Sequence, residues 1–330
     1  MPIPWPRGPL RGVSTGVSDI IGAVASEEHI RSVLRTVWHV TADECAPLAG
    51  MPDSWWSVTI GTERHVVRTA PESRRSRLLA ALTVTEALGG AGVAVGRPVR
   101  TADGALTATT PTGDIALLAG VIGRPLDATN PLDQLWWGDL LGRAHRALLP
   151  HQRLVSERLV MPQVNAPHLG VADWLRPTLG DVVQAVSRLM VTDQLTYGIL
   201  HGEPGPDAFR LDVRTGATGL TGWGPPVLGP LVYDVAVAVR HAGGPDAAEE
   251  LLDGYASAGP VDPDELAVAL PVLLRLHWAL VADAHARALA GATATVPLPR
   301  ASAMAVAARR DALEEARSAL ADLSHQSSAE

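Results

Sequence analysis

Side chains that could do chemistry gather in one stretch of the chain, residues 199–239, which reads ILHGEPGPDAFRLDVRTGATGLTGWGPPVLGPLVYDVAVAV. The stretch holds the imidazole of His201 and, among its four carboxylates, those of Glu203, Asp207 and Asp234. Carboxylate oxygens are the ligands that hard divalent cations prefer, so side chains of this kind could bind a cation. We therefore expect the functional site in this stretch.

The residue types that are missing exclude several other kinds of chemistry. The chain has no lysine, so all 27 of its basic residues are arginine and no step can use a lysine ammonium group. Cys45 is the single cysteine, which excludes an intramolecular disulfide and a thiolate-rich zinc site. The sequence has no Gly-x-Ser-x-Gly elbow and no Cys-His pair, so a hydrolase would lack its nucleophile. His277 and His285, with Asp283 nearby on one predicted helix, supply too few convergent ligands for zinc.

The elements that must position these residues change type partway along the chain. Short segments rich in β-branched and aromatic residues predict strands in the first part, and Ala- and Leu-rich segments predict helices after it. The predicted strands are residues 36–40, 55–60, 65–69, 93–99, 106–109 and 115–121, with helices at 27–35 and 74–88. The later helices are residues 133–149, 171–196, 231–242, 246–258, 263–289 and 302–323, with a β-rich insertion at 197–224.

This order predicts a bilobal α+β protein with a β-rich N-lobe and a mainly helical C-lobe. The predicted divisions are a loose N-terminal arm at 1–25, an N-lobe at 26–122, a C-lobe at 123–323 and a flexible tail at 324–330. A chain of 330 residues exceeds the usual size of one compact core, which agrees with two lobes.

The stretch 199–239 resembles the catalytic region of the aminoglycoside phosphotransferases and their relatives among choline and homoserine kinases. In that family a strand leads to His-Gly-Asp, an asparagine follows, and a hairpin leads to Ile-Asp-Trp or Ile-Asp-Phe and then to Tyr-Asp-Leu-Ala. The positions that match here are His201, Gly202, Trp223, Gly229-Pro230 and Tyr233-Asp234. Residues 92–104, 123–127 and 136–149 continue the resemblance, which implies a protein-kinase-like fold.

The resemblance also implies five catalytic parts. A lysine on the third strand grips the phosphates of ATP, a helix glutamate pairs with it, one aspartate orients the acceptor hydroxyl, and an asparagine and a second aspartate hold magnesium. This sequence departs from the family at these positions. Arg68 replaces the lysine, Glu203 replaces the aspartate of His-Gly-Asp, and Gly222 replaces the second magnesium aspartate.

Two of the five positions depend on the alignment. The helix glutamate falls near Ala81, with Glu86 a turn away, and the asparagine falls at Ala208, or at Asp207 if the loop shifts by one residue. The resemblance gives supporting roles to the remaining motif residues. His201 supports the loop by hydrogen bonding, Asp234 buttresses it, and Trp223 is structural.

These exchanges predict poor catalysis for physical reasons. The planar fork of an arginine binds phosphate with a geometry that differs from that of lysine. Glu203 carries its carboxylate about one methylene further out, and a misplacement of roughly 1 Å can cost about a hundredfold in rate. The loss at Gly222 is the gravest, because magnesium neutralises charge that develops on the transferring phosphoryl group, a contribution of several kcal/mol.

Composition narrows the partners. A net charge of -8 and a pI near 5.8 argue against nucleic acid, because that binding depends on clustered basic residues. The N-terminal MPIPWPRGPLRG lacks an apolar region after it, so it does not resemble a secretory signal. The apolar run at 115–122 is shorter than the roughly 20 residues that cross a bilayer as a helix. We therefore expect a cytoplasmic protein without nucleic-acid or membrane partners.

Three hypotheses for function follow. The first is a catalytically degraded family member, a pseudokinase-type binding or accessory protein in natural-product or peptide-modification biosynthesis, with a protein or peptide partner or a small-molecule ligand in the interlobe cleft. The second is an active ATP-dependent O-phosphotransferase on a small molecule or on Ser or Thr of a peptide, using Arg68, Glu203 and Asp207. The third is a homodimer without a ligand. The cofactor is accordingly either none or ATP with magnesium.

Overall fold

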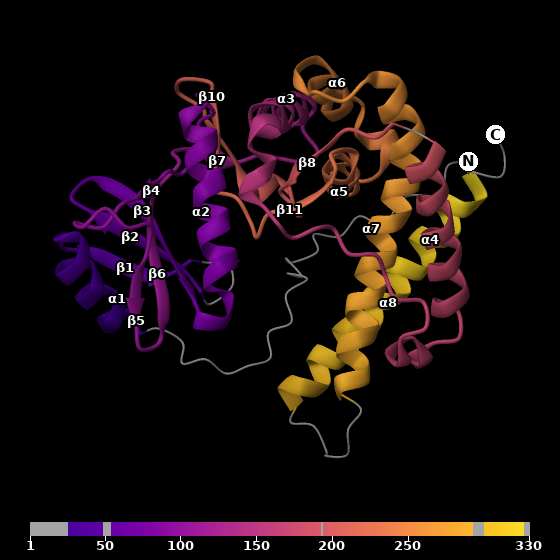
Figure 1. Cartoon of the computed structure of the whole chain (residues 1–330), viewed down its shortest axis with the longest axis horizontal. Coiled ribbons are helices and arrows are strands. Elements are labelled where there is room, and N and C mark those ends of the chain that lie inside the picture. The colour runs from indigo at the N-terminus through magenta and orange to yellow at the C-terminus, as the bar shows by residue number, and fades with distance from the viewer. Residues whose placement is uncertain (1–25, 49–53, 193, 293–299, 327–330) are drawn as a thin grey trace.

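The protein has two lobes that lie side by side in the computed structural model, which describes residues 26–48, 54–192, 194–292 and 300–326 (Figure 1). One lobe is built on an antiparallel sheet, and the other is mostly helical. The predicted bilobal α+β fold is confirmed.

The N-lobe sheet, within the described residues, has six strands in the order β1-β2-β3-β6-β4, with β5 also paired to β6. Its strands are β1 (Glu44–Pro47), β2 (Trp55–Ile60), β3 (Glu63–Ala70), β4 (Pro98–Val99), β5 (Ala108–Thr110) and β6 (Gly113–Ala119). The pairing of β2 with β3 sets Trp55 directly opposite Arg68. Side chains of such a pair lie on the same face of the sheet, so these two residues can contact each other.

Residues 36–40 do not form the strand that their β-branched and aromatic residues predicted. Helix α1 (Glu27–Val33) continues into a π-helical turn, Leu34–Trp38. The indole of Trp38 is buried and donates to the carbonyl oxygen of Val99 at 2.8 Å. This contact is distant in sequence, and local β-propensity is too weak a preference to oppose it.

Two further strands of the structure differ from what the sequence predicted. Strand β1 was not predicted, because in its sequence, ECAP, only Cys45 is buried and no clear alternation shows. Of residues 93–99, only β4 joins the sheet, where it pairs with β6. Val95 instead forms an isolated bridge with Leu220 of the C-lobe. Only the end of the segment therefore extends the sheet, and the part around Val95 contacts the C-lobe.

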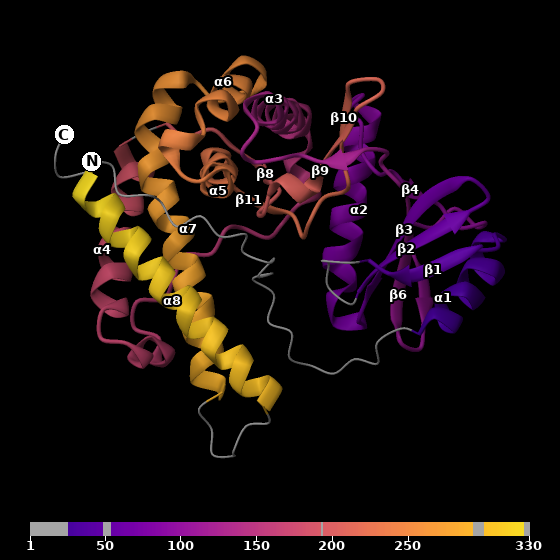
Figure 2. The ribbon, with the colours of Figure 1, turned by 180° about the vertical axis from the view of Figure 1, so that it is seen from behind.

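Helix α2 (Arg75–Gly90) belongs to both lobes. Leu78 and Leu82 pack in one cluster with buried residues of β6, whereas Val84 and Leu88 belong to the large core of the C-lobe. Figures 1 and 2 show this helix between the sheet and the helical half from either side. The apolar residues of one helix thus contribute to two cores.

The C-lobe consists of helices and short strand pairs. Strand β8 pairs with β11, and β9 pairs with both β7 and β10. Figure 2 shows α8 lying along α7. The elements are β7 (Arg124–Pro125), α3 (Pro131–Leu148), α4 (Leu175–Thr192), β8 (Tyr197–Leu200), β9 (Phe209–Asp212), β10 (Ala217–Leu220), β11 (Val227–Pro230), α5 (Val232–Ala242), α6 (Glu249–Ala258), α7 (Pro263–Ala292) and α8 (Arg300–Gln326).

Helix α7 contains, among the described residues, the one segment that is long and apolar enough to cross a membrane. An 18-residue window within Pro263–Gly291 has a mean hydropathy of 1.6, and 61% of that window is buried inside the protein. The sequence analysis missed this segment. Burial inside the protein accounts for its apolar character, since a helix that is hydrophobic around much of its circumference suits a core position.

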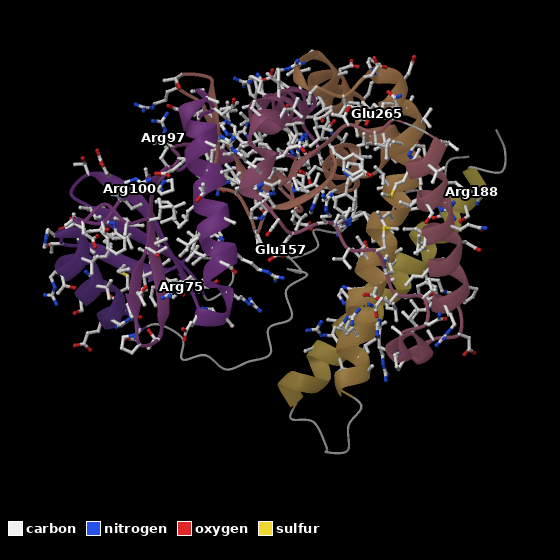
Figure 3. All side chains as sticks on the ribbon, viewed as in Figure 1. Arg75, Arg97, Arg100, Glu157, Arg188 and Glu265 are labelled. Atoms are coloured by element: carbon white, nitrogen blue, oxygen red, sulfur yellow. The ribbon has the colours of Figure 1, made fainter. Side chains whose placement is uncertain are left out.

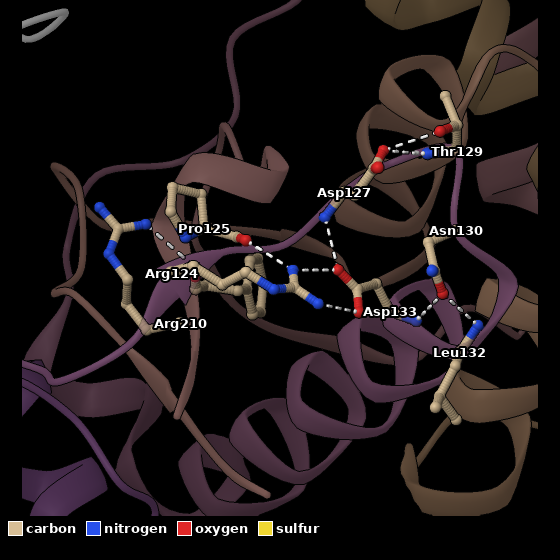
Figure 4. A network of polar contacts seen from close by, with 9 residues as sticks. Arg124, Pro125, Asp127, Thr129, Asn130, Leu132, Asp133 and Arg210 are labelled. Carbon is tan, nitrogen blue, oxygen red and sulfur yellow. Dashed lines mark hydrogen bonds and ion pairs between the residues drawn. The ribbon is translucent and has the colours of Figure 1, made fainter. Parts of the chain in front are cut away.

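The connector after the N-lobe sheet is fixed to the C-lobe by one buried carboxylate (Figure 4). Asp133 in the first turn of α3 accepts two hydrogen bonds from the guanidinium of Arg124, at 2.5 and 2.9 Å, and a third from the backbone N–H of Asp127 at 2.7 Å. The Asn130 side chain caps α3 by accepting from the N–H of Leu132 at 3.0 Å. The hydrogen bonds from Arg124 lower the pKa of Asp133 against the effect of burial. The network sets where the second lobe begins.

Replacing Asp133 with Asn should lower the free energy of unfolding by about 2 kcal/mol, because the charged acceptor is lost and the Arg124 fork is left partly unpaired. Urea unfolding at pH 7 measures the difference. Asp139→Asn is the control, since Asp139 lies on the same helix and pairs with Arg143 at the surface. It should change stability by less than about 1 kcal/mol. Equal losses for the two variants would contradict the structural role of Asp133.

Candidate functional site

The predicted site residues meet where β3 approaches two loops of the C-lobe. The loop after β8 carries His201, Glu203 and Asp207, and the loop between β10 and β11 carries Gly222 and Trp223. The backbone joins these loops, since the carbonyl oxygen of residue 208 accepts from the N–H of residue 221 at 2.9 Å. The site is therefore assembled from both lobes.

Arg68 is buried between the lobes with 8% of its surface exposed. Its Nη1 donates to the carbonyl oxygen of Trp223 at 3.0 Å, and its guanidinium carbon lies 4.3 Å from the ring centroid of Trp55. Burial lowers the pKa of Arg68 to about 10, which still leaves the guanidinium charged at neutral pH. The side chain that replaces the family lysine is thus engaged by the protein itself.

Arg68 has no carboxylate partner among the described residues, and burial is the one influence that shifts its pKa. Glu86, the carboxylate near the expected helix position, pairs instead with Arg100 at 2.8 Å. Figure 3 labels Arg100 in the N-lobe. Ala81, the residue at that position, is fully buried. The described residues therefore contain no equivalent of the lysine–glutamate pair.

Asp234 in the first turn of α5 organises the loop after β8. Its carboxylate is fully buried and accepts from the backbone N–H of His201 at 2.6 Å and from that of Gly202 at 2.9 Å. It also lies 3.0 Å from Nε2 of His145, whose Nδ1 is 2.9 Å from the hydroxyl of Tyr255. Three helices, α3, α5 and α6, thereby fix the backbone of one loop.

His201 and Trp223 form the buried floor of the site. Their rings pack at 66° with centroids 5.0 Å apart, and the Trp223 Nε1 donates to the carbonyl oxygen of Leu200 at 2.9 Å. Neither ring nitrogen of His201 makes a hydrogen bond of good geometry within the described residues. Burial lowers the pKa of His201, although the charge of Asp234 and the nearby backbone of Gly222 oppose this effect. His201 therefore stays neutral and contributes packing.

Glu203 is paired with the end of α5, although 46% of its side-chain surface is exposed. Its Oε1 lies 2.7 Å from Nε2 of His241 and 3.9 Å from Nη1 of Arg240. Burial acts to raise the pKa of Glu203, but the hydrogen bond to His241 and the positive charges nearby outweigh it, so the pKa is lowered. The carboxylate is ionised and already paired, which reduces its value as a base.

The basic pair Arg240-His241 was not predicted as part of the site. Both residues end a Val- and Ala-rich helix, and the sequence carries no signal that this helix end returns to the loop of Glu203. Arg240 packs over the ring of Trp278, with 5.0 Å between guanidinium carbon and ring centroid. Nδ1 of the neighbouring His277 lies 3.3 Å from the Tyr233 hydroxyl. Contacts between α5 and α7 thus position the residues that hold Glu203.

The residues present do not fit a magnesium-bound nucleotide. Gly222 has no side chain that could supply a ligand atom, and the carboxylate of Glu203 is paired with His241. Asp207 is exposed, and no hydrogen bond reaches its carboxylate from the described residues. No group of three or more His, Cys, Asp or Glu side chains within the described part of the chain is placed to hold a metal ion.

The backbone at Gly222 also differs from what an aspartate needs. Its φ is +155°, a conformation that residues with a Cβ rarely adopt. Space is not the obstacle, because a Cβ built there would meet only the side chain of Leu118, at 4.0 Å. The glycine is therefore matched to its loop, and an aspartate would have to distort the backbone to reach the same place.

Comparison with known proteins gives one family and a consistent fold. A family model described as "Phosphotransferase enzyme family" matches residues 48–269. The structure is similar to a microcompartment-associated aminopropanol kinase, with a TM-score of 0.68, 17% identity and coverage of 92% of this chain and 98% of that one. It is also similar to the amicoumacin kinase hAmiN in complex with AMP-PNP, Ca2+ and Ami (TM-score 0.64, 16% identity, 88% and 93% coverage). A third similar structure is the choline kinase LicA of Streptococcus pneumoniae (TM-score 0.59, 12% identity, 90% and 99% coverage).

A search of curated proteins found no significant match. At these identities the structural likeness establishes the kinase-like fold and says nothing of substrate. The predicted protein-kinase-like fold is confirmed in this sense.

The buried His277 should make the protein acid-sensitive. Burial, followed by the charge of Arg240, lowers the pKa of His277 to about 3, whereas an unfolded histidine titrates near 6.5. The unfolded state therefore binds more protons between these values, and stability should fall as the pH drops from about 6.5 toward 3. His277→Gln should remove on the order of 3 kcal/mol of this loss at pH 4. Urea unfolding from pH 8 to pH 4 measures it, and a pH profile identical to that of the wild type would contradict the assignment.

Proposed function

The chain belongs to the phosphotransferase enzyme family, and we propose that it is a pseudokinase-type member, a binding or accessory protein that does not transfer phosphate from ATP. One observation carries the proposal. At the position of the family's magnesium aspartate stands Gly222, and the carbonyl oxygen of the next residue, Trp223, is taken by Arg68 at 3.0 Å. The places for metal and phosphate are thus occupied by a glycine and by a contact within the protein.

The charges around this point support the proposal. Phosphoryl transfer relies on a lysine cation and on metal ions, which neutralise the negative charge that develops in the transition state. Arg68 supplies one cation, but its hydrogen bond is made to a backbone carbonyl. Glu203 stands at the position of the family aspartate that orients the acceptor hydroxyl, and its carboxylate is hydrogen-bonded to His241. Each group would have to leave an existing partner before acting on a substrate.

A second candidate function is favoured by the free carboxylate of Asp207. It is exposed and accepts no hydrogen bond from the described residues, and Glu203 is ionised in the same loop. An ATP-dependent O-phosphotransferase could use Arg68, Glu203 and Asp207 after rearrangement of the site. The structural neighbours include kinases named for amicoumacin, spectinomycin, aminopropanol and choline. By analogy with their names alone, the substrate of this alternative would be a small molecule.

The partner of a binding protein would be a protein, a peptide or a small molecule held between the lobes. We place this role in natural-product or peptide-modification biosynthesis in the cytoplasm, by analogy with the family. The acidic net charge of -8 favours a partner other than nucleic acid. A ligand-free homodimer through the helical lobe is the remaining alternative.

ATP with magnesium should leave the thermal unfolding midpoint unchanged. A ligand at about 100 times its dissociation constant would stabilise the fold by roughly 2.7 kcal/mol, enough to raise the midpoint visibly. Scanning calorimetry with ATP, with magnesium, with both and with neither measures the effect. Glu203→Ala and Asp207→Ala serve as paired variants. A magnesium-dependent rise that either variant abolishes would support the phosphotransferase and overturn the pseudokinase.

Replacing Gly222 with Asp should restore the family's residue but not its function. The variant should lose about 1–3 kcal/mol of stability because its φ of +155° is strained for any side chain. Gly180→Asp is the matched control, since Gly180 lies in α4 at an ordinary φ with no atom within 4 Å of an added Cβ. Urea unfolding compares the two. A stable Gly222→Asp protein that binds ATP only with magnesium would show that one residue separates this site from a working one.

A further inference from the structure

Arg68 and Trp223 join the two lobes across 155 residues of sequence. A second connection lies close by, where the N–H of Gly96 donates to the carbonyl of Leu220 at 3.0 Å and the N–H of Leu220 donates to the carbonyl of Ala94 at 2.9 Å. The second connection is made by backbone alone. The first depends on one side chain, so its strength is set by a single residue.

The surroundings of Arg68 leave it few ways to compensate its charge. The side chain is buried, no carboxylate of the described residues lies near it, and burial is the one influence on its pKa. A buried cation is unfavourable unless it is paired or hydrogen-bonded. The π face of Trp55 and the carbonyl oxygen of Trp223 are the two partners that the structure provides. Charged donors form the stronger hydrogen bonds, so this contact contributes more than an ordinary one.

Trp223 is suited to receive such a contact. Its ring is fixed in the C-lobe by the hydrogen bond to Leu200 and by packing on His201. Its carbonyl faces the N-lobe and lies between two glycines, Gly222 and Gly224. Glycine backbones reorient more freely than others, so the carbonyl can turn away without moving the ring.

We propose that Arg68 is an interlobe latch, in which Trp55 holds the guanidinium from β2 and the guanidinium holds the carbonyl of Trp223. The chain itself then fixes the N-lobe sheet against the loop 221–224. A ligand that takes the Arg68 guanidinium or the Trp223 carbonyl as its own partner must first break this bond. Opening of the latch would expose the cation and the carbonyl together. The latch stands whether or not the protein transfers phosphate, because it rests on contacts alone.

Hydrogen–deuterium exchange tests the latch directly, because local opening raises exchange only in the segments it releases. Arg68→Met keeps the aliphatic bulk and removes the donor. Peptides covering residues 217–224 should exchange about tenfold faster than in the wild type. Residues 63–70 should keep wild-type rates, because β3 is paired with β2 and β6. Peptides of α4 and α7 should be unchanged. Arg64→Met is the control, since Arg64 is exposed on the same strand, and it should leave all peptides at wild-type rates.

Unchanged exchange in Arg68→Met would overturn the latch, because losing the donor would then release nothing. An equal rise in α4 and α7 would also overturn it, because the opening would then be global. Trp55→Leu keeps the test decisive if the first variant does not fold. It removes the ring beneath the guanidinium and should raise exchange in residues 217–224 about threefold. Wild-type exchange of that segment in Trp55→Leu would equally overturn the proposal.

Discussion

The buried carboxylate of Asp234 is the interaction on which the arrangement of the site depends. A fully buried acid is costly unless its oxygens are satisfied, and here two backbone N–H groups and His145 provide partners. The same contacts fix the turn at Gly202, whose φ of +85° suits glycine. Glu203 follows this turn directly, and its side chain is paired with His241 at the end of α5. The carboxylate thus acts on structure and needs no role in chemistry.

The site separates residues that support its backbone from residues that would act on a substrate. His201, Trp223 and Asp234 match the family and are all buried. Arg68 and Glu203 differ from the family, and both have found partners inside the protein, Trp223 and His241. Both polar side chains are thus paired within the protein itself. This pairing agrees with the binding role that we propose.

The fold could be predicted from the sequence because its signals lie in short, continuous segments of the chain. The change from strand-like to helical patterns and the motif around His201 are both readable along the chain. The contacts that define the site's chemistry were not readable, because they join distant segments. Glu86 pairs with Arg100 and Glu203 pairs with His241 because a helix folds against a non-helical segment in each case, which no spacing encodes. The strand prediction for residues 36–40 was wrong for the same reason, since a long-range contact of Trp38 decided their conformation.

Helix α2 has a consequence for the protein as a whole. Its first half completes the packing beneath the sheet, and its second half completes the core of the helical lobe. Neither lobe can be cut out at a simple boundary, because each would lose part of its interior to the other. The two lobes therefore share one helix and are not two modules joined by a tether. A gene rearrangement that removes or exchanges one lobe would disrupt the interior of both lobes. Such a chain can therefore evolve by substitution of residues more easily than by exchange of lobes.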